Sequence, residues 1–293
     1  MHGWLILDKP LGVGSTDAVS AVKRALRAGG YPKAKVGHGG TLDPLATGVL
    51  PIALGEATKL AGRLLDSDKI YDFTLRFGEE TASLDAEGAV VATSAVRPSA
   101  AELEAELPRF TGPIAQTPPA YSALKVDGRR AYDLARAGEE VTLASRNVTI
   151  RALRSLATGS DEVTLTAHVS KGTYIRSLAR DIAHALGTVG HVTMLRRTKA
   201  GPFDLAHAIT LDELAEFGHG RALEHHLLPL RAGLDDIPAL SLTPDQAGAL
   251  RQGRVLAGIA ADDGQHFAML DEMPVALVEV EDREVRVVRG FNL

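Results

Sequence analysis

The stretch Lys69–Phe77 constrains the fold most strongly, because its apolar and polar side chains alternate. An aromatic residue or leucine stands at every second position, namely Tyr71, Phe73, Leu75 and Phe77. Period two is typical of a strand with one buried face, so we predict a half-buried antiparallel strand. Tyr71, at its start, fits either a core residue or a stacking face at the edge of a cleft.

Apolar runs bounded by turn residues predict further strands, and apolar positions at helical spacing predict helices. The predicted strands cover residues 4–7, 49–54, 147–157, 162–170 and 192–198. The predicted helices cover residues 15–28, 57–65, 99–107 and 211–217, and another follows Tyr174. Residues 111–138 are interpreted as a long, irregular, basic loop. Such a loop more often contacts a binding partner than serves only as a flexible connection.

The C-terminal part has a pattern of its own. Thr243-Pro244 has the residue preferences of a helix start. Beyond it, short apolar segments near 266–270, 274–280 and 283–288 are separated by turn signals. This pattern predicts a small β-rich domain, and we place the domain boundary near residue 232.

The composition is that of an ordinary globular protein, and it excludes several kinds of site. The chain has 293 residues, of which 45% are apolar and 24% charged, and no cysteine. There can be no disulfide, thiolate nucleophile or cysteine-ligated zinc, and the ten histidines show no metal-ligand spacing. Neither an apolar run of about 18 residues nor a signal-peptide pattern is present, so we expect a cytoplasmic protein with no membrane partner and no metal.

The net charge of −5 is unevenly distributed. Residues 1–201 hold 25 Lys and Arg against 21 Asp and Glu, whereas residues 202–293 hold 7 against 16. Residues 168–201 contain one acid, Asp181, and six cations: Lys171, Arg176, Arg180, Arg196, Arg197 and Lys199. Such a basic patch favours nucleic acid as a partner. A solvated face that only aids solubility would give the same pattern.

The glycine-rich stretch Gly37–Gly48 carries one carboxylate, Asp43. Glycine permits positive φ and close approach of another molecule, and Pro44 stiffens the backbone beside Asp43. This suits a functional carboxylate, but an Asp before Pro also forms simple turns. His38 in such a loop is more often a local hydrogen-bonding group than a catalyst. A phosphate-binding loop fits poorly, because the known glycine motifs are absent and a fixed Asp repels an anion.

Four motifs, in one order, connect this stretch with the rest of the chain. They are Asp8-Lys9-Pro10-x-Gly12, Lys35–Gly48, Gln116-x-Pro118-Pro119-x-Tyr121-Ser122-Ala123-Leu124-Lys125 and Lys171–Arg176. Together they resemble the TruB family of tRNA pseudouridine synthases, and the likeness runs over nearly the whole chain. The resemblance implies an α+β fold: a pseudouridine synthase-like catalytic domain on a mixed, largely antiparallel sheet, and a small C-terminal PUA-like β domain. The domains would be residues 1–232, with an RNA-binding loop at about 111–138, and 233–293.

The same resemblance implies isomerisation of uridine 55 to pseudouridine in the TΨC loop of tRNA, without cofactor or metal. Asp43 matches the catalytic aspartate and Arg176 the arginine that pairs with it. Tyr71, Tyr174 and Leu195 match pocket residues, and His38 matches a histidine that holds extruded nucleotides. The cations expected to contact RNA are Lys125, Arg129, Arg130, Lys171, Arg196 and Arg197.

The chemistry agrees with a single carboxylate. Isomerisation breaks the N1–C1′ bond, rotates the base and joins C5 to C1′, so it needs a nucleophile or base beside the sugar and no redox group. Asp43 could attack C1′ or remove a sugar proton, and an arginine partner favours its charged form. The target uridine must be flipped out, at a cost on the order of a few kcal/mol that stacking in the pocket offsets.

Partners and alternatives complete the expectation. Nothing resembles the basic tail of a guide-RNA assembly, so we expect a stand-alone, monomeric enzyme without guide RNA. One alternative is a non-catalytic tRNA-folding module, which would need the basic loop but not Asp43. Another is a sugar or nucleotide hydrolase, for which the sequence shows no second carboxylate at a comparable site.

Overall fold

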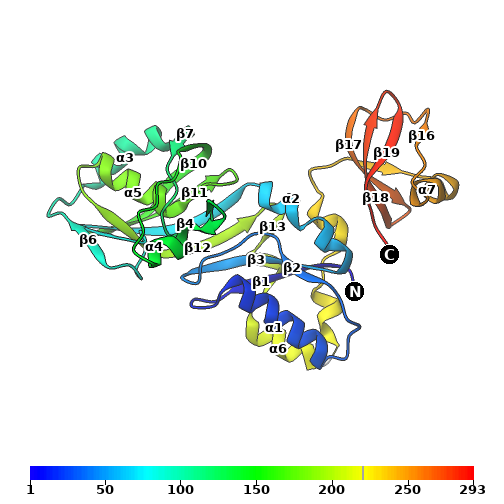
Figure 1. The fold of residues 1–293 in the computed structure, drawn as a ribbon, viewed down its shortest axis with the longest axis horizontal. Coiled ribbons are helices and arrows are strands. Elements are labelled where there is room, and N and C mark those ends of the chain that lie inside the picture. The colour runs from blue at the N-terminus through cyan, green and yellow to red at the C-terminus, as the bar shows by residue number, and fades with distance from the viewer. Residues whose placement is uncertain (220) are drawn as a thin grey trace. The chain divides into compact units, whose positions relative to one another are not determined.

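A computed structural model describes residues 1–219 and 221–293 of the chain (Figure 1). The chain divides into two compact units. The first unit comprises residues 1–42, 50–65 and 201–293, and the second comprises residues 43–49 and 66–200. Strand β3 (Ala46–Leu54) contributes to both, because the division falls within it.

The elements of the first unit come from both ends of the chain. Its strands are β1 (Gly3–Lys9), β2 (Val36–His38), β13 (Phe203–Asp204), β14 (Ala208–Ile209), β15 (Ala239–Ser241), β16 (Leu256–Ala257), β17 (Gly264–Leu270), β18 (Met273–Glu281) and β19 (Glu284–Gly290). Its α-helices are α1 (Ser15–Ala28), α2 (Ala61–Asp66, with its last residue in the second unit), α6 (Leu211–His219) and α7 (Pro244–Arg251). Its 3-10 helices are η1 (Gly55–Lys59), η3 (Leu205–His207), η4 (Ala222–His226) and η5 (Leu230–Gly233).

The second unit is built almost entirely from the middle of the chain. Its strands are β4 (Lys69–Phe77), β5 (Glu79–Thr81), β6 (Val90–Thr93), β7 (Gly112–Gln116), β8 (Lys125–Val126), β9 (Arg129–Arg130), β10 (Arg146–Thr158), β11 (Glu162–Val169) and β12 (Gly190–Ala200). Its helices are α3 (Ala100–Glu106), the 3-10 helix η2 (Leu107–Phe110), α4 (Ala131–Arg136) and α5 (Ile175–Ala185).

The sheet of the second unit has the order β3-β12-β4-β11-β10-β7. Only β3 and β12 are parallel, and the other neighbours are antiparallel. The sheet is therefore mixed and largely antiparallel, as predicted. Helix α5 packs on one face, where Ile175, Leu178 and Ile182 meet Phe73 and Leu75 in one core cluster. Burying each such side chain contributes about 1.5–3 kcal/mol, which holds α5 against the sheet.

In the first unit, β1 pairs in parallel with β14, and β2 pairs antiparallel with β3. Helices α1 and α6 lie side by side (Figure 1). The α1 residues Val19, Val22 and Leu26 are buried, which confirms the helical spacing seen in the sequence. Trp4 is fully buried, and its indole N–H donates to the carbonyl of Leu230 at 3.1 Å.

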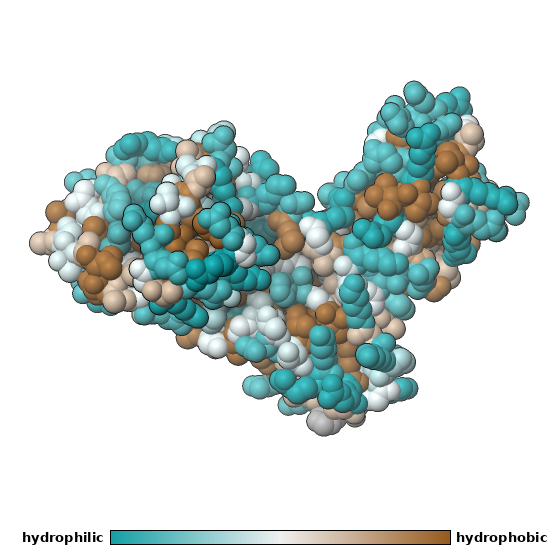
Figure 2. Space-filling model, viewed as in Figure 1, coloured by the Kyte–Doolittle hydropathy of each residue, from teal (hydrophilic) through white to brown (hydrophobic). Residues whose placement is uncertain are grey.

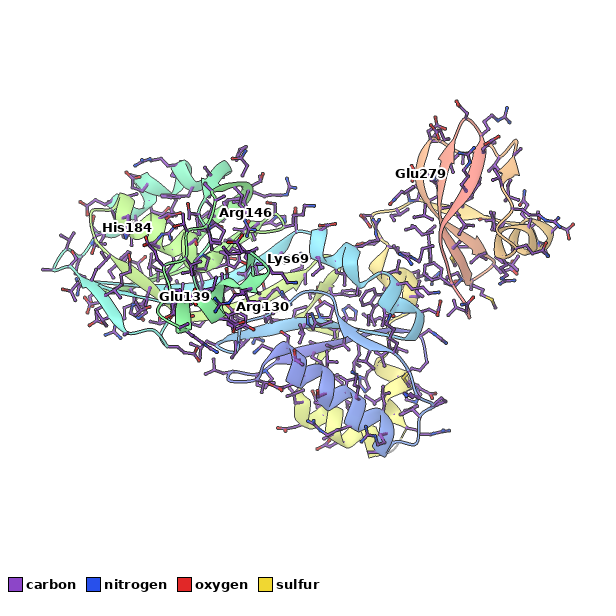
Figure 3. All side chains as sticks on the ribbon, viewed as in Figure 1. Lys69, Arg130, Glu139, Arg146, His184 and Glu279 are labelled. Atoms are coloured by element: carbon purple, nitrogen blue, oxygen red, sulfur yellow. The ribbon has the colours of Figure 1, made fainter. Side chains whose placement is uncertain are left out.

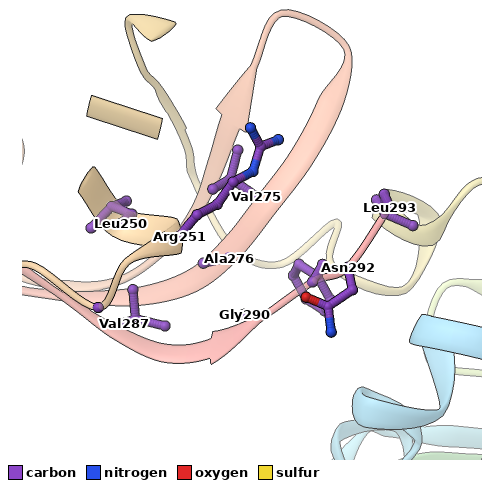
Figure 4. A pocket seen from close by; sticks show the side chains of 10 residues that line it. Leu250, Arg251, Val275, Ala276, Val287, Gly290, Asn292 and Leu293 are labelled. Atoms are coloured by element: carbon purple, nitrogen blue, oxygen red, sulfur yellow. The ribbon is translucent and has the colours of Figure 1, made fainter. Parts of the chain in front are cut away.

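The C-terminal strands form a second sheet with the order β15-β17-β18-β19-β16. This small curled sheet encloses a core of its own, and Thr243 opens α7 with a capping box. The predicted β-rich fold of the C-terminal part is confirmed. A hollow of about 590 Å³ lies between the end of α7 and strands β18 and β19 (Figure 4). Apolar surface is visible over this domain (Figure 2), where Met273 and Val288 are among the exposed side chains.

Residues 111–138 differ from the sequence-based expectation of an irregular loop. They contain β7, the β8–β9 hairpin and α4. Asp127 and Gly128 form the hairpin turn with φ of 49° and 82°. Asp-Gly between short strands is a strong hairpin signal, because both positions need positive φ. The basic residues of this stretch therefore lie on an ordered hairpin and helix.

The predicted helix at 57–65 is also different in detail. The chain forms the 3-10 helix η1 to Lys59 and then begins α2 at Ala61. The tighter turn ends at Leu60, whose N–H donates to the carbonyl of Ala57 at 2.9 Å. Each short helix contributes one buried apolar residue, Ala57 in η1 and Leu64 in α2. In the sequence, this spacing of apolar residues is therefore the same as that of one longer helix.

Candidate active site

The carboxylate of Asp43 forms an ion pair with Arg176, with Oδ2 at 2.9 Å from Nη2. The two side chains differ in exposure: Arg176 is 6% exposed, whereas Asp43 is 46% exposed. The turn that the Asp-Pro sequence suggested is present, since the N–H of Ala46 donates to the carbonyl of Asp43. The side chain of Asp43, however, bonds a residue more than one hundred positions away, so it is not merely a turn former.

Arg176 is held by three further acceptors. Nη1 donates to the carbonyl of Ser83 at 2.7 Å and to Oδ2 of Asp85 at 3.2 Å. Nη2 also donates to the carbonyl of Tyr121 at 2.9 Å. A guanidinium presents its donors in a rigid, planar fork, so bonds on both terminal nitrogens fix its orientation. The arginine that faces Asp43 is therefore held in one orientation before any ligand binds.

Asp85 is a second carboxylate bonded to Arg176, and the sequence did not single it out. Its side chain is 14% exposed, and its other oxygen accepts from the hydroxyl of Ser83 and the N–H of Glu87. Both oxygens are thus used to hold the local loop and Arg176. Asp85 lies in none of the four motifs, and only the Ser-Leu-Asp turn chemistry could have drawn attention to it.

Leu84, between these two residues, has a left-handed backbone with φ of 62°. This conformation is costly for a residue with a branched side chain. It is held by the N–H of Leu84, which donates to Thr81, and by its carbonyl, which accepts from Val192. The strained turn places the Ser83 carbonyl and the Asp85 carboxylate on the same nitrogen of Arg176.

Two features fix the chain on either side of Asp43. Before it, the hydroxyl of Ser15 accepts from the N–H of Leu42 at 2.8 Å and donates to its carbonyl at 2.9 Å. After it, Gly48 has a φ of 100°, and a Cβ there would lie 2.1 Å from the carbonyl oxygen of Arg197. Only glycine allows β3 and β12 to approach so closely. The glycine at the end of the motif therefore serves strand packing.

Tyr71 and Leu195 lie on the sheet face that α5 covers. Both pack, partly buried, against the core cluster that contains Ile175 and Leu178. Leu195 stands opposite Phe73, and so shares a face with Tyr71 two residues along β4. The structure thus brings Tyr71, Leu195 and the helix that carries Arg176 to one face of the second unit.

Tyr174 occupies the N-cap position of α5, two residues before Arg176. Its backbone is bonded by the amide of Gln116, which accepts from the Tyr174 N–H at 2.8 Å and donates to its carbonyl at 3.2 Å. Gln116 is fully buried. His38 lies in β2, opposite Ile52 of β3, and so belongs to the first unit.

The basic hairpin presents Lys125, Arg129 and Arg130 as exposed side chains. Arg129 pairs with Glu139 at 3.0 Å, and Arg130 donates to the carbonyl of Ala123 at 3.3 Å. Arg130 and Glu139 are marked in Figure 3. The surface around α4 is strongly hydrophilic (Figure 2).

The cations of residues 168–201 are less available than their number suggests. Arg197 is 1% exposed, and its Nε donates to the carbonyl of Val49 at 2.8 Å. Lys171 pairs with Asp66 at 2.9 Å, and Arg196 donates to the hydroxyl of Thr47 at 3.4 Å. Arg176 is buried as well, so counting residues overstates the charged surface of this segment.

Within the described residues, no group of histidine and acidic side chains is arranged to hold a metal ion. None of the helices in those ranges combines the length and apolarity needed to cross a bilayer. The hollow of the C-terminal domain is lined mainly by apolar side chains, with Arg251 and Asn292 as its polar ones and no acidic side chain (Figure 4). The second unit thus contains a carboxylate paired with a fixed arginine, and an aromatic side chain, Tyr71, on the sheet face that the arginine-bearing helix covers.

Comparisons with known proteins match the chain to one family. The family model described as "TruB family pseudouridylate synthase (N terminal domain)" matches residues 24–175, and "tRNA pseudouridylate synthase B C-terminal domain" matches residues 176–235. A protein of Novosphingobium aromaticivorans named tRNA pseudouridine synthase B is 66% identical over 298 residues, covering 100% of this chain and 98% of its own. One of the same name from Zymomonas mobilis is 60% identical, covering 100% and 96%.

Among solved structures, a Cbf5-Nop10-Gar1 complex has a chain with a TM-score of 0.76 and 26% identity, covering 99% of this chain and 84% of its own. An archaeal box H/ACA Nop10-Cbf5 complex gives 0.74 and 24%, covering 99% and 86%. The fold is that of the pseudouridine synthases, with a large mixed sheet and a C-terminal β domain. The chain belongs to the TruB family of these enzymes and is an isomerase.

Proposed function

We propose that this enzyme converts uridine 55 to pseudouridine in the TΨC loop of tRNA, with Asp43 as the catalytic group. The observation that carries the proposal is the ion pair between half-exposed Asp43 and buried Arg176. Support for tRNA as the substrate comes from the two relatives above, which are similar over their full length and are named for it. A cytoplasmic location and action as a monomer without guide RNA remain part of the proposal.

The pair explains how one carboxylate could suffice. The ion pair with Arg176 holds the Asp43 carboxylate in place, and a carboxylate oxygen is what attack on C1′ or removal of a sugar proton requires. The fixed guanidinium limits the carboxylate to few orientations without covering it, because Asp43 remains 46% exposed. Orientation of this kind contributes to rate by holding reacting atoms in place.

The remaining residues have roles in substrate binding. Tyr71 offers an aromatic face for the flipped base, and Tyr174 and Leu195 complete the pocket. His38 would hold neighbouring extruded nucleotides. Lys125, Arg129 and Arg130 would contact phosphates, with Lys171 and Arg196 contributing once their present partners are exchanged for RNA. Because the Arg197 side chain is buried, we do not include it among the contacts.

Asp85 supplies the second carboxylate that a hydrolase would need, but its environment disfavours that reaction. Both of its oxygens accept hydrogen bonds, from Arg176, Ser83 and Glu87. A general acid must instead carry a proton toward the leaving group. We therefore keep isomerisation as the function.

The test uses an unmodified tRNA transcript labelled with tritium at C5 of uridine. Joining C5 to C1′ releases that label, so one equivalent per tRNA should appear in solvent with no added metal. A transcript with cytidine at position 55 should release none. Asp43→Asn should bind tRNA and release none either. Asp161→Asn, which alters an exposed pair with Arg97, is the matched control and should retain activity.

Label released from another position would overturn the site assignment. Tight tRNA binding by the wild type without release would favour the RNA-folding module instead. Release by Asp43→Asn at more than trace levels would remove Asp43 from the chemistry.

A further inference from the structure

The ring of Tyr174 is covered by an arginine that none of the motifs contains. The guanidinium carbon of Arg146 lies over the ring, 4.9 Å from its centroid. Arg146, which is labelled in Figure 3, is the first residue of β10. Tyr174 is the N-cap of α5. A cation within about 6 Å of an aromatic centroid is attracted to the ring face, more strongly when water is excluded.

The arginine is itself held in place. Its Nη2 donates to the carbonyl of Gly172, two residues before Tyr174. Its Nε is shielded from solvent, and a Cβ on Gly172 would lie 3.6 Å from the guanidinium carbon. One guanidinium therefore bonds the backbone that leads into Tyr174 and also contacts the ring.

The neighbouring strand holds the same tyrosine through its backbone. Arg146 stands directly opposite Gln116 in the β10–β7 pairing. Gln116, fully buried, bonds both the N–H and the carbonyl of Tyr174. The two cross-strand partners thus act on different parts of one residue, since Gln116 fixes the backbone of Tyr174 and Arg146 fixes its ring.

We infer that Arg146 is a positioning residue for the isomerisation, acting through Tyr174. With one ring face covered by the guanidinium, the nucleotide must meet Tyr174 by its other face or its hydroxyl. The stack limits rotation of the ring, so Tyr174 is ordered before the uridine enters. The inference deepens the proposed function and rests on it for its catalytic part.

The first test needs no substrate. The protein is labelled with 3-fluorotyrosine, and the fluorine resonance of Tyr174 among the five tyrosines is assigned with Tyr174→Phe. Arg146→Met, which removes the charge and the planar group but keeps an unbranched side chain, should shift or broaden the Tyr174 resonance and leave the others in place. Arg154→Met, an exposed arginine on the same strand, should change none. An unmoved Tyr174 resonance in Arg146→Met would overturn the inference.

The second test measures conversion of the tRNA transcript in a single turnover at saturating enzyme. Arg146→Met should slow it roughly tenfold, the order expected from a partly desolvated cation–π contact, with tRNA affinity within about twofold. Arg146→Lys should recover part of the rate, because a charge remains over the ring. In a Tyr174→Leu background, Arg146→Met should cause no further loss, since the residue acts through the tyrosine.

Three results would contradict the role. Losses that add in the double variant would mean that Arg146 acts on its own. A flatter dependence of affinity on salt with the rate kept would make it a phosphate contact. If Arg146→Met converts tRNA at the wild-type rate, Tyr174 does not need Arg146 to be positioned. Thermal melting of each variant separates these effects on rate and affinity from misfolding. Arg146→Lys is the milder change and is measured in the same way. A wild-type enzyme that fails to convert tRNA would refute the proposed function, while the fluorine experiment would still decide the stack.

Discussion

At the scale of single residues, the shape of the Arg176 side chain matters as much as its charge. Its two terminal nitrogens serve Asp43, Asp85 and two carbonyls. Lysine carries the same charge but has one nitrogen and no fork. We expect Arg176→Lys to lower the single-turnover rate at least tenfold and to lower the stability by about 1–3 kcal/mol, because buried acceptors lose donors.

Rates must be measured well below the melting temperature of the variant, so that the loss is not one of folded protein. Arg180→Lys is the matched control, since Arg180 lies one turn along α5 and pairs with its neighbour Asp181. We expect that control to change the rate less than twofold. A wild-type rate in Arg176→Lys would mean that a charge alone orients Asp43.

Lys69 gives the second residue-scale prediction. Its side chain is 8% exposed, and its Nζ donates to the carbonyl of Ser67 at 2.6 Å. Burial, and to a lesser degree the charge of Arg197, lower the pKa of Lys69 from 10.5 to about 8. Between these two values the unfolded chain binds more protons than the folded one, so the contribution of Lys69 to stability rises with pH across the window.

The check is chemical unfolding of wild type and Lys69→Met from pH 7 to pH 10. The free energy of unfolding of the wild type should rise relative to that of the variant as the pH rises above 8. All other titrating groups are the same in the two proteins, so their contributions cancel in the difference. Lys199→Met, at an exposed position, should show no such trend. A constant difference for Lys69→Met would mean that Lys69 titrates at its ordinary pKa.

The residue scale also shows what a sequence can and cannot reveal. The family resemblance implied the pairing of Asp43 with Arg176, because each residue stands in one of the motifs that carry the resemblance, and the structure contains that ion pair. Asp85 and Arg146 stand in none, and their importance arises from contacts with Arg176 and Tyr174 across long stretches of chain. Periodicity reports which face is buried, but not which distant side chain a buried guanidinium will bond.

At the scale of elements, the alternation of apolar residues and the residues typical of helix starts predicted strands and helices correctly. Amino-acid composition predicted the structure of residues 111–138 incorrectly. Strand β4 and the start of α7 at Thr243-Pro244 were predicted correctly, because period two and the residue preferences of a helix start are local properties. Residues 111–138 were interpreted as irregular because they combine three prolines with four cations. Their order comes from the Asp127-Gly128 turn and from the buried Ala131 and Leu134 of α4, which a composition average conceals.

The β8–β9 hairpin supports a prediction about RNA binding. Replacing Lys125, Arg129 and Arg130 with glutamine should flatten the slope of log affinity against log salt, by roughly 0.9 for each phosphate that the variant no longer neutralises on duplex-like RNA. Arg129 already pairs with Glu139, so its share should be the smallest. Affinity at low salt should fall, while the single-turnover rate at saturating enzyme should be largely kept, because phosphate contacts position the RNA.

The control for the hairpin removes the same charge elsewhere in the second unit. Arg76, Arg109 and Arg154 are exposed, and replacing all three with glutamine changes the net charge equally. We expect the control to alter the slope far less. Equal flattening in both variants would show that net charge, and not the hairpin, governs the salt dependence.

At the scale of the whole molecule, the residues proposed for the site and the excess of acidic residues lie in different parts of the chain. Apart from His38, every residue proposed for the site lies between Asp43 and Arg196, within the second unit. The excess of acids lies after residue 201. An acidic region repels a polyanion, so the C-terminal part is a poor candidate for phosphate contacts. Sequence alone reveals this separation, because charge can be counted without knowing the fold.

The last prediction concerns the C-terminal domain, which has its own buried cluster around Leu240, Val278 and Val285. Residues 238–293 carry 5 arginines against 9 acidic residues. We expect a chain ending at Ile237 to keep the single-turnover rate within about twofold and to bind tRNA as tightly or more tightly at low salt, because a negative charge is removed. The measurements are tRNA affinity across a salt series and single-turnover conversion, with thermal melting to confirm that the remainder is folded.

In the full chain, Arg251→Gln with Arg254→Gln is the companion variant, and it should leave affinity unchanged. A tenfold weaker affinity in either protein, with the rate kept, would show instead that this domain contacts the RNA through its arginines despite its net charge.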